Sequence, residues 1–212
     1  MRHFPLVLGR CALLVNDLHQ RTLEPTSPSY APAAVGAVER LLPLLAFCRA
    51  HGVPTVFALI APPNWRRTEL RAQAPGEPPE VIAAQAVSPL ARALGPEPGD
   101  FVFEKPPISG LWHDTPVDGY LRERGRDIVL VAGVTLQFGC DTTVRDAYNR
   151  GYQVAALRDC CAGRAMADEG WGPVAEDEVE RVCFTIWARW FARVLTAAEA
   201  LAELRAQAPE KE

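Results

Sequence analysis

Apolar and polar positions along the chain fall into two alternating kinds of segment. Short, nearly continuous apolar runs predict strands buried on both faces of a sheet. Between them, apolar residues recur at helical spacing, and several of these stretches end at a glycine. The predicted strands are Cys11–Asn16, Val53–Ile60, Phe101–Phe103, Asp127–Ala132, Tyr152–Leu157 and a short final one at Ala192–Leu195. The predicted helices are Ala33–His51, Thr115–Arg124, Cys140–Arg150, Glu176–Trp190 and Ala197–Arg205.

This alternation predicts an α/β fold. Apolar strands separated by helices, joined by right-handed crossovers, give a three-layer α/β/α sandwich around a mostly parallel, doubly wound, Rossmann-like sheet of about six strands. Residues 62–99 are interrupted by repeated prolines, and we expect an excursion with one or two short helices there. With 212 residues, the chain is expected to form a single domain over 1–212.

Composition and charge narrow the classes of function. Hydrophobic residues make up 49% and charged residues 23%, as in ordinary globular proteins. The net charge is −4 and no basic run suits a phosphate backbone, so we expect no nucleic-acid partner. No apolar run reaches bilayer length and no signal peptide is evident, so we expect a cytoplasmic protein without membrane contact. The six cysteines form no Cys-x-x-Cys pair and are expected to be reduced thiols.

Polar residues with catalytic potential follow three of the predicted strands. Asp17 follows the first strand, Lys105 the third, and the segment 133–140 follows the fourth and opens a helix. Because parallel strands meet at one carboxyl edge, these groups can form an acid/base pair beside an anion or oxyanion site. Each residue also has a non-catalytic explanation. Asp17 can be a loop or helix-cap residue, and Lys105 can be a solvated surface charge.

Four stretches, in order along nearly the whole chain, resemble the isochorismatase-like hydrolase superfamily. Residues 12–18 (Ala-Leu-Leu-Val-Asn-Asp-Leu) resemble its opening strand, which ends in the catalytic aspartate. Residues 105–111 resemble its lysine motif, and residues 133–147 resemble its nucleophile loop and helix. Residues 191–199 resemble its closing strand and helix. The resemblance implies that Asp17 and Lys105 are catalytic, and that a cis peptide bond joins Val134 to Thr135.

One departure from the cysteine-hydrolase pattern bears on the chemistry. Counted back from the Arg-Asp-Ala of the helix, the nucleophile falls at position 139, which is Gly139, and the thiol follows at Cys140. True isochorismatases also have glycine in this position. Because one residue on a helix turns a side chain by about 100°, we expect Cys140 to point away into the packing. A loop remodelled by one residue would instead bring Cys140 into the site.

The glycine pattern implies general acid catalysis without a covalent intermediate. Asp17 would protonate a small carboxylate or enol-ether substrate. For this role, burial would have to raise the pKa of the Asp17 carboxyl. Lys105 would hold a substrate carboxylate or tune Asp17, and Gly139 would leave room for substrate. The resemblance also places His19, Trp112, Val134 and Thr135 around the substrate. His19 either faces the pocket or caps the loop. The chain lacks the glutamine and tyrosine of authentic isochorismatases, so the substrate itself is left open.

The rival hypotheses come from other classes of protein. A cysteine amidohydrolase would use Cys140 as nucleophile, Asp17 as base and Lys105 to lower the thiol pKa, on a small amide or ureido compound. A non-catalytic binding or oligomer-forming subunit is a third possibility. The four histidines do not match the metal cluster of nicotinamidase-like relatives, so we expect no metal and no cofactor. The resemblance also implies a homo-oligomer acting on a small molecule.

Overall fold

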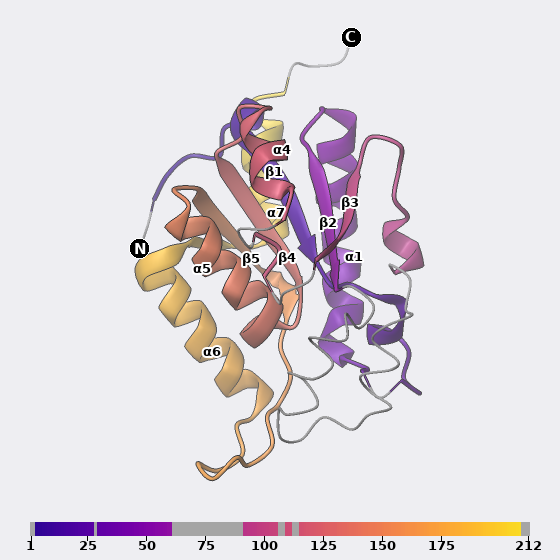
Figure 1. Cartoon of the computed structure of the whole chain (residues 1–212), viewed down its shortest axis with the longest axis vertical. Coiled ribbons are helices and arrows are strands. Elements are labelled where there is room, and N and C mark those ends of the chain that lie inside the picture. The colour runs from indigo at the N-terminus through magenta and orange to yellow at the C-terminus, as the bar shows by residue number, and fades with distance from the viewer. Residues whose placement is uncertain (1–2, 28, 61–90, 106–108, 112–114, 209–212) are drawn as a thin grey trace.

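A computed structural model describes residues 3–27, 29–60, 91–105, 109–111 and 115–208, and these fold as one sheet with helices on both faces (Figure 1). The six strands of this part are all parallel and run in the order β3-β2-β1-β4-β5-β6. This is the doubly wound α/β sandwich that the sequence predicts. The strands are β1 Cys11–Asn16, β2 Thr55–Ile60, β3 Phe101–Lys105, β4 Ile128–Val134, β5 Gln153–Ala162 and β6 Arg193–Leu195.

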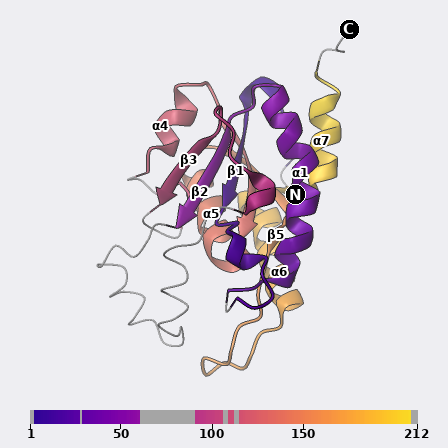
Figure 2. The ribbon, with the colours of Figure 1, turned by 90° about the vertical axis from the view of Figure 1, so that its right-hand side faces the viewer.

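The helices form two layers, one on each side of the sheet. Figure 2 shows α1 and α7 side by side on one face, and α4, α5 and α6 cover the other. Short π-helical turns precede α5, at Leu136–Cys140, and follow α6, at Trp187–Phe191. The helices are α1 Pro32–Ala50, α4 Val117–Arg122, α5 Asp141–Asn149, α6 Glu176–Ile186 and α7 Ala197–Arg205.

The central strand β1 shows why the sheet needs cover on both faces. Successive side chains of a strand point to opposite faces, and every residue of β1 is buried. Leu13 and Val15 join the core beneath α1 and α7, whereas Ala12 and Leu14 join the core beneath α4, α5 and α6. A continuous apolar run is therefore what a central parallel strand requires.

Three strands extend further than the sequence predicts, and β4 is one of them, since it ends at Val134 rather than at Ala132. Lys105 is the last residue of β3 rather than a loop residue after it, because β3 pairs with β2 as far as Ile60 opposite Lys105. Strand β5 continues to Ala162, beyond the predicted end at Leu157. Its last residues pair with the end of β4, past an irregularity between Val131 and Gly133.

The helices mostly match their predicted ranges, with shifts at the ends. Helix α1 begins at Pro32, a residue suited to a first helical position because it lacks an N–H. Predicted helix 140–150 begins at Asp141, because the residues before it form the π-helical turn. Residues 61–90, most of the predicted excursion, lie outside the described residues. No described helix combines the length and apolarity needed to cross a bilayer.

Candidate active site

Asp17 stands directly beyond the end of β1, in a backbone conformation that is uncommon for a side chain other than glycine. Its φ is 47°, and its N–H continues the sheet by donating to Ala58 O at 3.0 Å. Its carbonyl accepts the His19 N–H at 2.8 Å. Aspartate tolerates the left-handed region better than most residues, and such conformations concentrate at functional sites. The turn directs the carboxylate toward the ends of β2 and β3.

The Asp17 carboxylate is fixed by groups from three other positions. Oδ2 lies 2.6 Å from Lys105 Nζ at the end of β3. Oδ1 accepts the backbone N–H of Ile60, at the end of β2, at 2.7 Å, and lies 3.7 Å from His19 Nε2. The Lys105 side chain is fully buried and that of Asp17 is 15% exposed. Asp17 and Lys105, which the sequence places at the ends of parallel strands, thus form a close, largely buried ion pair.

The electrostatics of this pair set the charge on Asp17. Burial alone raises the pKa of the carboxyl, but the Lys105 charge, the hydrogen bond from Lys105 and the nearby His19 ring outweigh it and hold the pKa below its usual value. The direction is opposite to the raised pKa that a general acid requires. At neutral pH Asp17 is therefore a carboxylate, which can accept a proton.

Gly139 lies against this ion pair. A Cβ added at position 139 would stand 3.2 Å from Asp17 Oδ2 and 3.6 Å from Lys105 Nζ. It would also stand 3.2 Å from the carbonyl oxygen of Val134. A side chain at this position would therefore begin directly beside the carboxylate and the ammonium. Glycine places no side-chain atom there.

Cys140 is directed elsewhere. It is fully buried and belongs to the core between the sheet and helices α5 and α6, together with Leu14 and Val131. The Cys140 thiol forms a hydrogen bond with the Cys161 thiol. This bond and burial raise the pKa of Cys161 well above its usual value. The Cys161 thiol in turn donates to Val131 O at 3.5 Å. The chain places Cys140 in packing, not beside Asp17.

The loop that carries Gly139 is held at both ends. The peptide bond between Val134 and Thr135 is cis, as the resemblance implied. Gly133 has φ 132°, and a Cβ there would lie 2.1 Å from Asn16 O, so only glycine fits. Thr135 O accepts the N–H of Cys140 at 3.2 Å, which closes the π-helical turn. Val134 is buried and Thr135 is half-buried.

His19 faces Asp17 rather than capping its loop. It is the residue before a short 3₁₀ turn at Gln20–Thr22, yet its side chain makes no capping hydrogen bond there. The ring is 2% exposed, with Nε2 toward Asp17. The other predicted substrate-binding residue, Trp112, lies outside the described residues.

Sequence reasoning missed the residue that joins the two loops of the site. The Thr143 hydroxyl donates to Gly139 O at 2.6 Å and accepts the N–H of Gly110, in the lysine motif, at 2.8 Å. It also lies 3.4 Å from Asn16 Oδ1. The available signal was its spacing, because a threonine four residues after Gly139 on a helix stands beneath the Gly139 carbonyl.

The described residues contain no group of three His, Cys, Asp or Glu side chains placed to hold a metal ion. The chemistry that these residues offer is proton transfer by a carboxylate beside an ammonium, at a position where the neighbouring residue has no side chain. Such an arrangement suits the activation of a water molecule or the protonation of a leaving group.

Comparison with known proteins gives consistent matches. The family model for the isochorismatase domain matches residues 11–172. The ureidoacrylate amidohydrolase RutB of Methylorubrum extorquens is 40% identical over 83 residues, which cover 38% of this chain and 33% of that protein. The chain thus matches about a third of the length of this relative.

Two further relatives match over more of their length. The maleamate amidohydrolase of Pseudomonas putida is 27% identical over 155 residues, 72% of each chain. The crystal structure of a cysteine hydrolase from Pseudomonas syringae pv. phaseolicola is similar with a TM-score of 0.87 and 29% identity, over 97% of both chains. The similarity to the latter covers the whole sheet and both helical layers.

Proposed function

Because the chain belongs to the isochorismatase family of hydrolases, we propose that it hydrolyses a small amide or ureido carboxylate without a covalent intermediate. The observation that carries the proposal is the position of Gly139. The residue beside the Asp17–Lys105 pair has no side chain, and the neighbouring thiol of Cys140 is fully buried in the core.

The substrate class comes from the relatives. The names of two of them denote amidohydrolases of ureidoacrylate and maleamate, compounds that carry a carboxylate together with a C–N bond to a carbonyl carbon. A thioester route needs a thiol that reaches the substrate, which a fully buried Cys140 does not supply. Attack by water on the same bond needs a base and a space beside it, and Asp17 and Gly139 supply these.

The reaction then proceeds through direct attack by water. A water molecule held beside Gly139 gives one proton to Asp17 Oδ2 as its oxygen bonds to the carbonyl carbon. The C–N bond of the tetrahedral intermediate breaks as Asp17 returns that proton to the leaving nitrogen. The products are a carboxylic acid, or a carbamic acid from a ureido group, and an amine or ammonia. Lys105 keeps Asp17 ionised for the first step.

A second candidate is general acid hydrolysis of an enol ether, as in isochorismatases. The observation that favours it is the same glycine, since those enzymes also have glycine in this position. It requires Asp17 to be protonated before the bond breaks. The lowered pKa of Asp17 makes that form scarce at neutral pH, which favours the base mechanism.

The test is product release from three substrates by the purified protein. Ureidoacrylate and maleamate release ammonia on complete hydrolysis, whereas isochorismate releases pyruvate. We expect ammonia from at least one amide and its loss in Asp17→Asn, with an unchanged circular dichroism spectrum as the control for folding. Pyruvate release alone would replace the amide proposal with the enol-ether mechanism. Ammonia release that persists in Asp17→Asn would remove Asp17 from the mechanism.

A further inference from the structure

The segment between β5 and α6 is a closed arm of residues 166–174. Met166 and Val174 pair across its base through two backbone hydrogen bonds of 2.9 and 3.0 Å. At its tip, Asp168 Oδ1 accepts the N–H groups of Gly170 and Gly172 at 2.7 and 2.8 Å. Figure 1 shows the arm extending away from the sheet, below α6. These bonds give the arm a defined shape.

The tip of the arm displays an indole ring. Trp171 is 96% exposed. The glycines on either side of it, Gly170 and Gly172, have φ values of 97° and 87°, which other residues rarely adopt. The Gly-Trp-Gly sequence thus specifies a turn that directs the ring outward. A large aromatic side chain surrounded by water is costly for an isolated chain and typical of the centre of an interface.

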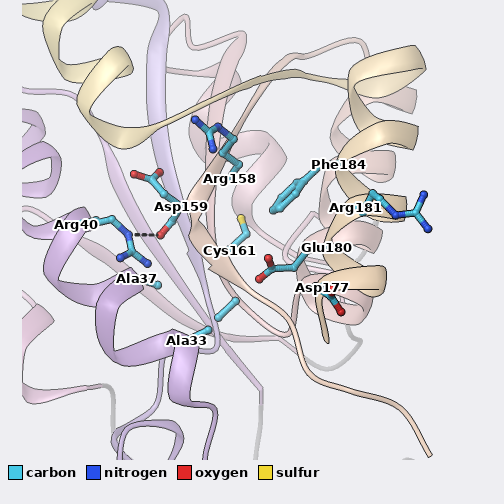
Figure 3. Close-up of a pocket in the computed structure, with 11 residues that line it drawn as sticks. Ala33, Ala37, Arg40, Arg158, Asp159, Cys161, Asp177, Glu180, Arg181 and Phe184 are labelled. Carbon is cyan, nitrogen blue, oxygen red and sulfur yellow. Dashed lines mark hydrogen bonds between the residues drawn. The ribbon is translucent and has the colours of Figure 1, made fainter. Parts of the chain in front are cut away.

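A cavity of about 440 Å³ lies beside the root of the arm, between α1 and α6 and over the end of β5 (Figure 3). Phe184 points into it from α6, and Ala33 and Ala37 form a small-residue wall on α1. Arg40 faces it from the same helix and is oriented by donating to Asp159 O at 2.8 Å. The cavity is distinct from the Asp17 site, whose residues do not line it.

The walls of this cavity suit an indole ring. Phe184 offers an aromatic face, and Arg40 offers a guanidinium for cation–π contact with the ring. The carboxyl of Glu180, which points into the cavity in Figure 3, is an acceptor for the indole N–H. The volume lies in the range of roughly 300–1,000 Å³ that accommodates small organic ligands.

Several observations favour a second copy of this chain as the source of that ring. The chain's own Trp171 is exposed and therefore does not fill its own cavity. The arm joins β5 to α6, and these two elements also form walls of the cavity. The arm and the cavity are therefore neighbours on the surface. A twofold contact requires this, because each copy must offer both at one patch. The arm carries the exposed acids Asp168 and Glu169, and the exposed arginines Arg158 and Arg181 are among the cavity's lining residues, which also include the acids Asp159, Asp177 and Glu180. Within the described residues, neither arginine forms an ion pair.

We propose that two copies of this chain associate through a twofold contact in which Trp171 of each copy occupies the cavity of the other. The arm's acids then face the partner's arginines at the rim. The interaction surface consists of the arm and the walls of the cavity on α1, β5 and α6.

Sedimentation velocity over a dilution series tests this contact. We expect the wild-type chain to dimerise, and Trp171→Ala to raise the dimer dissociation constant at least about tenfold. The matched control is Trp190→Ala, which removes an indole that is 59% exposed at the far end of α6. It should leave the constant unchanged. A wild-type chain that stays monomeric, or a Trp171→Ala variant that dimerises normally, would overturn the proposal.

A mixing experiment separates this contact from a folding defect. Ala33→Phe fills the cavity from α1 and keeps the tryptophan, whereas Trp171→Ala keeps the cavity and loses the tryptophan. Each variant alone should associate weakly with a native circular dichroism spectrum. Their mixture should form a heterodimer, because one intact contact can form between them. If both variants fold and the mixture associates no better than either alone, the tryptophan and the cavity are not partners.

Discussion

Gly139→Ala tests whether the space beside the Asp17–Lys105 pair is where the reaction occurs. The added methyl carbon would lie 3.2 Å from both Asp17 Oδ2 and Val134 O. Such crowding costs about 1–3 kcal/mol of stability. Replacing glycine within a helical turn returns up to about 1 kcal/mol. We therefore expect the free energy of unfolding to fall by only about 0–3 kcal/mol, so the variant should fold.

The effect on catalysis should be much larger. A water molecule must lie within about 2.6–3.2 Å of its base to transfer a proton. The methyl carbon would occupy that distance from Asp17 Oδ2. Because general base catalysis contributes roughly 10²–10⁴-fold, we expect kcat to fall at least about 100-fold.

The assay pairs kcat on the amide substrate with urea unfolding of the same preparations. A variant with Tm and unfolding free energy close to wild type and a kcat reduced as stated would support the mechanism. Gly139→Ser serves as a second variant, since its hydroxyl also displaces water from this space. A folded Gly139→Ala enzyme with wild-type kcat would mean that the reacting water lies elsewhere.

Further predictions concern the groups around Gly139. Lys105→Met leaves the Asp17 carboxylate buried without its cation, and we expect urea unfolding at pH 7 to show a loss of about 3–5 kcal/mol. Since the Asp17 pKa is lowered in the folded chain, its ionised form stabilises the fold above the unfolded-state pKa, and this stability is lost as pH falls through the lowered value. Unfolding measured against pH should show this acid loss in wild type and not in Asp17→Asn. The kcat of wild type should likewise stay constant from neutral pH down to below about pH 4, where an aspartate ordinarily titrates; activity that rises as Asp17 protonates would indicate a general acid instead. Thr143→Val removes the hydroxyl that donates to Gly139 O, and should lower stability by about 1–3 kcal/mol in thermal unfolding, whereas Thr143→Ser should restore most of it. Equal losses in the Val and Ser variants would mean that the methyl group, not the hydrogen bond, matters.

Much of the fold could be predicted because it depends on local apolar patterning. The first strand, Cys11–Asn16, and the last helix, Ala197–Arg205, have the predicted bounds. The strand β5 was predicted too short because Arg158 and Asp159 interrupt its apolar run. In the fold, the pairing of β5 with β6 ends at Leu157, opposite Leu195. Arg158 and Asp159 come directly after it, and their polar side chains are exposed and half-buried.

The candidate site could be predicted only in outline. That Asp17 and Lys105 meet follows from the rule that parallel strands share a carboxyl edge. Their 2.6 Å contact, and therefore the lowered pKa of Asp17, depends on Lys105 being the last residue of β3, which pairing with β2 decides. Sequence reasoning expected burial to raise that pKa, and the opposite direction arises because a buried cation outweighs burial. The spacing of Thr143 from Gly139 is a local signal, but its contact with Gly110 joins two distant loops and no local pattern records it.

The central claim is that hydrolysis proceeds without a cysteine nucleophile, and the kcat of Cys140→Ala at saturating substrate tests it most directly. We expect a folded variant with kcat within about twofold of wild type, since Cys140 is buried in the core and its removal costs packing rather than chemistry. A folded Cys140→Ala protein that has lost at least about 100-fold in kcat would instead make Cys140 the nucleophile.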